Sequence, residues 1–216
     1  MTEQNFEAMR RAMVASQLRT TGVNDPRVVA AMGAVPREHF IPADRSALAY
    51  ADTFVPLGHG RQLNPPMALG RMLAEARLRG DEKALVIGAA TGYSAALLAR
   101  LAGSVTALEE EPELAAFART ALAGSGVELI EGPLTQGHAA GAPYDFVLID
   151  GAVEHVPQAI VDQVAEGGAV ALALVENGVT RLCIGRVFAG VLGTTIYSDA
   201  ATAVLPGFSK PRGFSF

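Results

Sequence analysis

Apolar positions recur with a helical period at the start of the chain. From Phe6 to Leu18 they fall on one helical face, and Asp25-Pro26 begins a second predicted helix that runs through Met32, with proline at its first helical position. Between Val35 and Pro66, five prolines and the Gly58-His59-Gly60 triplet interrupt any regular period. This stretch is expected to hold short elements and turns, as segments that cover a site often do.

Beyond residue 66, short apolar runs alternate with helical ones. The predicted strands are 84–87, 105–108, 127–130, 146–149 and 169–174, and the predicted helices are 67–78, 93–101, 112–122 and 156–164. These strands are apolar throughout, which is typical of a parallel sheet covered on both faces. Two further strands, 181–187 and 194–197, have no helix between them and predict an antiparallel edge. The pattern therefore predicts a doubly wound α/β fold with a mostly parallel, seven-stranded sheet.

Composition excludes several classes of protein. Half of the 216 residues are hydrophobic and 18% are charged, as in a globular domain. The formal charge is −5, and Lys and Arg form no stripe, so nucleic acid is not expected as a partner. Cys183 is the single cysteine, and the histidines show no metal-ligand spacing, so neither a disulfide nor a metal site is predicted. An amphipathic start and the lack of a long apolar run predict a cytoplasmic protein that does not enter a membrane.

The first candidate site is the turn after the strand at 84–87. Small residues from Gly88 through Ala90 and Thr91 to Gly92 let the backbone approach a ligand, and the next strand ends at Glu109, whose carboxylate can accept two ribose hydroxyls. Tight packing alone would also need small residues here, and Glu109 could instead belong to a solvated helix start. The loop and the acid together favour a nucleoside cofactor, either a dinucleotide or S-adenosylmethionine.

Most of the chain resembles the protein-L-isoaspartate O-methyltransferase family. The segment Val35-Pro36-Arg37-Glu38 is the most specific part of this resemblance. The other matching residues are Met13-Val14, Gln17-Leu18, Gly22-Val23, Asp25, Ala31-Met32, Phe40, Pro42, Ala49-Tyr50, Asp52, Pro56-Leu57-Gly58, Gly60, Ile87-Gly88, Gly92-Tyr93, Ala142-Pro143-Tyr144-Asp145, Pro157 and Gly167-Gly168.

The resemblance implies a class I methyltransferase that uses S-adenosylmethionine to esterify isoaspartyl carboxylates in damaged proteins. It also implies that residues 1–80 form a helical N-terminal extension with an acceptor-side loop. Residues 81–216 then form a Rossmann-like cofactor-binding domain within one structural unit. The expected partner is a protein or peptide bearing isoaspartate. The oligomeric state and the role of the tail after Pro206 stay open.

The acceptor-side loop departs from the family pattern G-Q-[TS]-I-S-Q-P. Here the loop is Gly60-Arg61-Gln62-Leu63-Asn64-Pro65-Pro66, so Asn64 stands where the family has a hydroxyl residue. Arg61 could pair with a substrate carboxylate or could be a solvated loop residue. The run Asn64-Pro65-Pro66-Met67 is also similar to the motif of amino-group methyltransferases, but its fourth residue is not aromatic and no target-recognition region is present.

The cofactor half departs from the family at three places. Val86 and Ala90 stand where the family has an acid and a glycine, and Gly132-Pro133-Leu134 replaces G-D-G. Asp150, after the strand at 146–149, could supply a new carboxylate.

The candidate catalytic residues are Asn64, Arg61 and Asp150. The candidate cofactor-binding residues are Gly88, Ala90, Thr91, Gly92, Glu109, Gly132 and Pro133. Three functions fit this pattern: an isoaspartyl methyltransferase, a methyltransferase with a changed acceptor, and a catalytically impaired homologue that acts as a binding or scaffold protein. His59 and His155 are expected to be loop residues, and Cys183 a buried hydrophobe.

Overall fold

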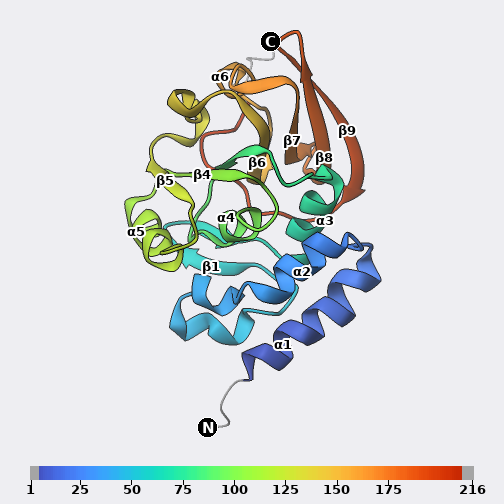
Figure 1. The fold of residues 1–216 in the computed structure, drawn as a ribbon, viewed down its shortest axis with the longest axis vertical. Helices are drawn as coiled ribbons and strands as arrows, with labels where there is room; N and C mark the ends of the chain where they lie inside the picture. The colour runs from blue at the N-terminus through green and yellow to red at the C-terminus, as the bar shows by residue number, and fades with distance from the viewer. Residues whose placement is uncertain (1–4, 211–216) are drawn as a thin grey trace.

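A seven-stranded mixed sheet forms the centre of the protein in a computed structural model, which describes residues 5–210 (Figure 1). The strand order is β5-β4-β3-β6-β7-β8-β9. The bounds are β3 Lys83–Ile87, β4 Ser104–Glu109, β5 Glu128–Glu131, β6 Tyr144–Val153, β7 Val164–Glu176, β8 Val179–Phe188 and β9 Val191–Asp199. Strands β3 to β7 pair in parallel, whereas β8 and β9 add an antiparallel edge. This confirms the predicted doubly wound sheet.

Apart from α6, the helices after residue 66 begin and end within a few residues of the prediction. Their bounds are α1 Phe6–Met13, α2 Pro26–Ala34, α3 Pro66–Ala76, α4 Tyr93–Leu98, α5 Pro112–Ala121 and α6 Gln158–Val161. The Asp25 side chain caps α2 by accepting bonds from the Arg27 and Val28 amides. Helix α1 continues into a π-helical turn (Val14–Leu18) and a 3₁₀ turn (Arg19–Thr21), so the predicted helix at 6–18 covers two of these helical elements.

The proline-rich stretch consists of short elements, as predicted. Two 3₁₀ turns, Arg37–Phe40 and Ala43–Leu48, precede a hairpin of β1 (Val55–Gly58) and β2 (Arg61–Leu63). The hairpin carries Arg61 and is followed at once by Asn64. Short 3₁₀ turns also follow β5, at Leu134–Gln136 and Ala139–Gly141.

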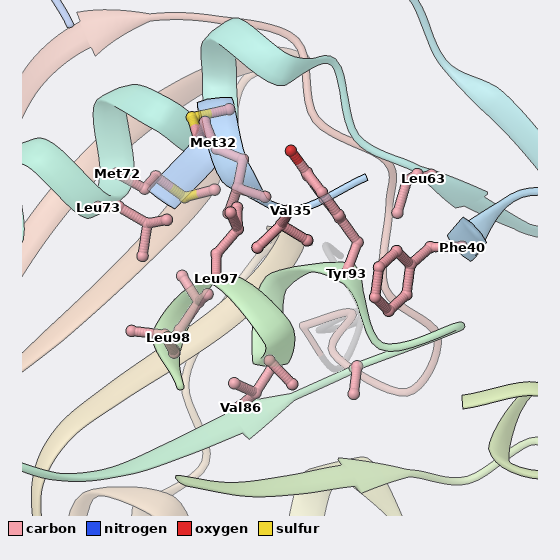
Figure 2. Close-up of a cluster of buried hydrophobic side chains, with 14 of the residues drawn as sticks. Met32, Val35, Phe40, Leu63, Met72, Leu73, Val86, Tyr93, Leu97 and Leu98 are labelled. Carbon is pink, nitrogen blue, oxygen red and sulfur yellow. The ribbon is translucent and has the colours of Figure 1, made fainter. Parts of the chain in front are cut away.

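Two apolar clusters cover the two faces of the sheet. The larger one packs the N-terminal helices and α3 to α5 against side chains such as Val86 on β3. Figure 2 shows part of it, with Met32, Met72 and Leu73 above α4 and Val86 beneath that helix. The smaller cluster joins the opposite face to α6 and to Leu205 and Phe208 near the chain end. The second face is therefore closed in part by the C-terminal segment.

Several elements differ in length from the prediction. Strands β7 and β9 have 13 and 9 residues and extend beyond the predicted 169–174 and 194–197 at both ends. Strand β6 continues to Val153 because Ala152 and Val153 pair with β7 after a register shift that follows Leu148. Helix α6 has only four residues, because β7 already begins at Val164.

Helix α3 of the N-terminal region packs on β7 and β8. The expected boundary at residue 80 stays a prediction. Within residues 5–210, no helix has the length and apolar character that crossing a bilayer requires.

Candidate functional site at the carboxyl edge of the sheet

The loop after β3 and the end of β4 meet, as the sequence predicts. The Gly88 and Ala89 amides each donate to the Leu108 carbonyl over 3.0 Å, and the Ala90 amide donates to Glu109 Oε2 over 2.6 Å. Gly88 has a φ of +79°, in the region that favours glycine. These bonds hold the loop directly against the Glu109 carboxylate.

Two other predicted loop residues face different parts of the protein. The Thr91 hydroxyl donates to the Phe40 carbonyl over 2.7 Å and so ties the loop to the N-terminal region. A Cβ atom at Gly92 would lie 2.8 Å from Leu122 Cδ1, next to α5. Their cofactor-binding role stays a prediction, while their visible contacts are with the fold itself.

Glu109 is fully buried, which excludes a solvated helix start at this residue. Its Oε1 accepts bonds from the amides of Glu110 and Glu111 at 3.0 and 3.1 Å, and from Arg61 Nη1 at 2.6 Å. With the Ala90 bond, four donors surround one carboxylate. Glu109 is thus held in place by charge and by backbone amides together.

Arg61 lies in the same cluster and is only 7% exposed. Besides its ion pair with Glu109, its Nη2 donates to the Gly88 carbonyl over 3.3 Å. Arg61 is therefore not a solvated loop residue. It pairs with a carboxylate of its own chain in this arrangement, and its role toward a substrate stays a prediction.

Asn64 and Asp150 form a second buried polar group. Asn64 Nδ2 donates to Asp150 Oδ1 over 2.7 Å, and Asn64 Oδ1 accepts from the Ala203 amide over 2.7 Å. The Asn64 side chain therefore joins the hairpin, β6 and the C-terminal segment. Asn64 Nδ2 also donates to the Asp150 main-chain carbonyl over 3.2 Å. A serine hydroxyl has one hydrogen, so it could not reproduce both donations to Asp150.

Asp150 lies within β6, and the expectation that it follows the end of that strand is wrong. The chain stays extended through Val153 because it pairs with β7 and with the C-terminal segment. Burial raises the pKa of Asp150, and the Asn64 amide together with the Arg61 and Arg37 guanidinium groups offsets this rise only in part.

The replaced G-D-G stretch also comes to this edge. The Gly132 amide donates to the Glu109 carbonyl over 3.0 Å, and Pro133 precedes the 3₁₀ turn at Leu134–Gln136. The Leu134 amide lies 3.4 Å from Glu110 Oε2. The backbone thus brings Gly132 and Pro133 next to the end of β4, as parallel neighbouring strands require.

Val86 points into the apolar cluster under α4, beside Leu97 and Leu98 (Figure 2). An acid at this position would be buried among hydrocarbon side chains in this arrangement.

His59 lies in a turn beside Glu111 and Glu113, and His155 lies in a loop, as predicted. Cys183 is buried in β8, also as predicted. Within the described part of the chain, no three His, Cys, Asp or Glu side chains gather into a possible metal site.

The sequence analysis missed two residues beside the site. Arg37 is fully buried, donates from Nη2 to the Asn64 carbonyl over 2.7 Å and lies 4.7 Å above the Tyr93 ring. Leu205 packs over Gly88 and Gly151. The apolar residues on either side of the Pro206-Gly207 turn were the signal for Leu205. The signal for Arg37 was its place in Val35-Pro36-Arg37-Glu38, the most specific part of the family resemblance.

Ala90→Gly is expected to raise the free energy of unfolding by about 0.5–1 kcal/mol, since Ala90 has a φ of +49° that costs an L-residue more than glycine. Ala89→Gly is the matched control, because φ at Ala89 is not positive, and it should lower stability by about 0.4–1 kcal/mol. Urea denaturation followed by circular dichroism measures both. An Ala90→Gly variant no more stable than the wild type would contradict the expected strain.

Comparison with known proteins gives one family. The sequence model described as "Protein-L-isoaspartate(D-aspartate) O-methyltransferase (PCMT)" matches residues 9–183. A protein-L-isoaspartate O-methyltransferase of Rhodopseudomonas palustris is 42% identical over 167 residues, which cover 76% of this chain and 68% of the relative. One from Koribacter versatilis is 37% identical over 205 residues, 94% of this chain and 92% of the relative.

Solved structures agree on the fold. A protein-L-isoaspartate O-methyltransferase superposes with a TM-score of 0.80 at 20% identity, over 92% of this chain and 66% of that one. A Plasmodium falciparum protein of the same class, solved with S-adenosyl-L-homocysteine, gives a TM-score of 0.76 at 18% identity, over 94% of this chain and 99% of that one. With the extent of the sequence match, it follows that this chain belongs to the protein-L-isoaspartate(D-aspartate) O-methyltransferase family.

Proposed function

We propose that this protein is an S-adenosylmethionine-dependent protein-L-isoaspartate O-methyltransferase, which forms methyl esters on isoaspartyl carboxylates in damaged proteins. The family match over residues 9–183 carries the proposal, because it includes the hairpin with Arg61, the loop after β3 and the end of β4. The substrate is an isoaspartyl protein or peptide, and the cytoplasm stays the expected compartment.

The residue types where the strand order reverses suit a nucleoside cofactor. This reversal lies between β3 and β6 and is called the switch point of the sheet. In open α/β sheets, ligands bind at the switch point, beyond the carboxyl ends of the strands. Gly88 begins the adjacent loop, and Glu109 supplies a carboxylate at the end of the next strand. These two features led to the prediction of a nucleoside cofactor, and the family resemblance then favoured S-adenosylmethionine over a dinucleotide.

The arrangement of side chains at this place does not fit a bound nucleoside. Arg61 already occupies Glu109 Oε1, and a Cβ atom at Gly88 would lie 2.6 Å from Leu205 Cδ2. The space beside both features is therefore filled by the chain itself, and no catalytic step follows from this arrangement.

The acceptor side has three candidates, Asn64, Arg61 and Asp150. A carboxylate acceptor is already ionised at neutral pH, so the site has to align it and stabilise charge more than it has to remove a proton. Buried amide and guanidinium donors suit that task. In the present arrangement these donors are bound to Asp150 and Glu109, so they become available only when those contacts change.

A second candidate function is a non-catalytic binding or scaffold protein. The observation that favours it is the filled position above Gly88. A chain that kept this arrangement permanently would retain the fold and the family motifs without a methyl donor. The replacement of the family serine by Asn64 is consistent with this function and also with a changed acceptor.

Methyl transfer from radiolabelled S-adenosylmethionine tests these functions. An isoaspartyl peptide is compared with the same peptide containing ordinary aspartate, and base-labile methyl ester is counted. We expect label on the isoaspartyl peptide alone. Equal labelling of both peptides would favour a changed acceptor, and no labelling in the presence of a bound cofactor would contradict the proposed activity.

A further inference from the structure

A short C-terminal segment, Ala203–Phe208, lies along the end of β6. The Ala152 amide donates to the Ala203 carbonyl over 2.7 Å, and the Leu205 amide donates to the Ala152 carbonyl over 2.9 Å. Val204 thereby pairs in parallel with Ala152. Farther along, the Phe208 carbonyl accepts from the Glu154 amide over 3.1 Å, and Phe208 is 1% exposed. The segment is thus attached to β6 and the residue after it by backbone bonds at both ends, and the buried Phe208 side chain anchors its far end.

Leu205 projects from this segment onto the switch point. Its side chain is 3% exposed and packs on two glycines, one after β3 and one in β6. A Cβ atom at Gly88 would lie 2.6 Å from Leu205 Cδ2, and one at Gly151 would lie 2.6 Å from Leu205 Cγ. These two glycines border the place where the sheet order reverses, so Leu205 occupies the position at which an open α/β sheet binds its ligand.

Arg61 closes the same position from the hairpin. It lies 3.3 Å from where a Cβ atom of Gly88 would be, and its ion pair occupies the carboxylate that a ribose would need. An apolar side chain and a cation from distant parts of the sequence therefore fill one site. A nucleoside could enter only if both moved.

Asn64 connects the two closing elements. Its Oδ1 accepts from the first amide of the C-terminal segment, and its Nδ2 is bound to β6. Asn64 directly follows the strand that carries Arg61. Movement of the segment would leave Asn64 Oδ1 without the Ala203 amide, so release at the cofactor side changes the acceptor side as well.

We propose that Ala203–Phe208 is an autoinhibitory gate that competes with the nucleoside cofactor for the switch point. The structure corresponds to the closed state. Cofactor binding displaces Leu205 from Gly88 and Gly151 and separates Arg61 from Glu109. The inference rests on the proposed function in one respect, that an S-adenosyl nucleoside binds at this edge. Apparent affinity is then reduced by the fraction of molecules in which the gate is open.

Hydrogen exchange on the full-length chain, with and without S-adenosylhomocysteine, tests the gate without any substitution. The amides of Ala203 and Leu205 are hydrogen-bonded in the closed state, so they should exchange faster when the nucleoside is bound. A typical ligand contact would slow them. Unchanged or slower exchange in a saturated complex would overturn the gate and leave the proposed function standing.

Calorimetric titration with S-adenosylhomocysteine provides the second measurement. Leu205→Ala weakens closure, so we expect binding that is about tenfold tighter than in the wild type. Val204→Ala is the matched control, because Val204 belongs to the same segment but is 71% exposed. The affinity of this variant for S-adenosylhomocysteine should equal that of the wild type. Equal affinity in wild type and folded Leu205→Ala would overturn the gate alone. Absence of binding in the wild type and in both folded variants would overturn the gate and the proposed function together.

Discussion

Glu109→Ala is expected to lower the free energy of unfolding by about 3–5 kcal/mol, the range for removing one partner of a buried ion pair. The substitution leaves the Arg61 guanidinium buried without its carboxylate and takes an acceptor from the amides of Ala90, Glu110 and Glu111. Chemical denaturation followed by circular dichroism measures the loss.

Glu131→Ala is the matched control for this prediction. The pair between Glu131 and Arg119 is also short, 2.5 Å, but its side chains are 44% and 57% exposed. Its removal should therefore change stability by no more than about 1 kcal/mol. Adding Arg61→Met to Glu109→Ala should restore part of the loss, because no buried charge then stays unpaired. A Glu109→Ala loss no larger than that of the control would refute the role assigned to this pair.

The same prediction affects how a cofactor titration is interpreted. Weaker S-adenosylhomocysteine binding in Glu109→Ala could arise from the missing ribose acceptor or from a disturbed loop after β3. The stability measurement separates these causes. A variant that stays folded under the titration conditions and still loses affinity supports direct contact between Glu109 and the nucleoside.

Arg37→Ala is the second substitution with a large expected effect, a loss of about 3–5 kcal/mol, as for truncation of a large buried side chain. Arg37 fills the space between the Tyr93 ring and the Asn64 carbonyl, and it is fully buried. Truncation leaves a cavity and removes the donor from a buried carbonyl. Thermal and urea unfolding report both effects.

Arg37→Met separates volume from charge. Burial lowers the pKa of Arg37, because loss of hydration disfavours its charged form. Methionine keeps much of the volume and carries no charge. Arg37→Met should therefore lower the free energy of unfolding by only about 1–3 kcal/mol, the cost of one unsatisfied carbonyl. Arg11→Ala, with a side chain that is 73% exposed, should alter stability by less than about 1 kcal/mol. If Arg37→Ala matched Arg11→Ala, the packing role would be wrong.

The succession of strands and helices along the chain after residue 66 could be predicted from the sequence. Strands such as 84–87 and 146–149 are apolar at every position because both faces of a parallel sheet are covered, and that burial leaves a signal in the sequence. The meeting of the loop after β3 with Glu109 was also predictable, because neighbouring parallel strands end at the same edge. The family resemblance rested on local motifs of the same kind.

The contacts of the site residues could not be predicted in this way, because they join segments that are far apart in the sequence. Arg61 and Glu109 are 48 residues apart, Asn64 and Asp150 are 86 apart, and Asn64 and Ala203 are 139 apart. No local pattern encodes such pairs, because each depends on which buried polar groups find partners when distant segments pack. Leu205 has an ordinary place in the sequence, an apolar residue before a Pro-Gly turn. Its position over Gly88 follows from the pairing of its backbone with Ala152, which burial of Phe208 helps to hold.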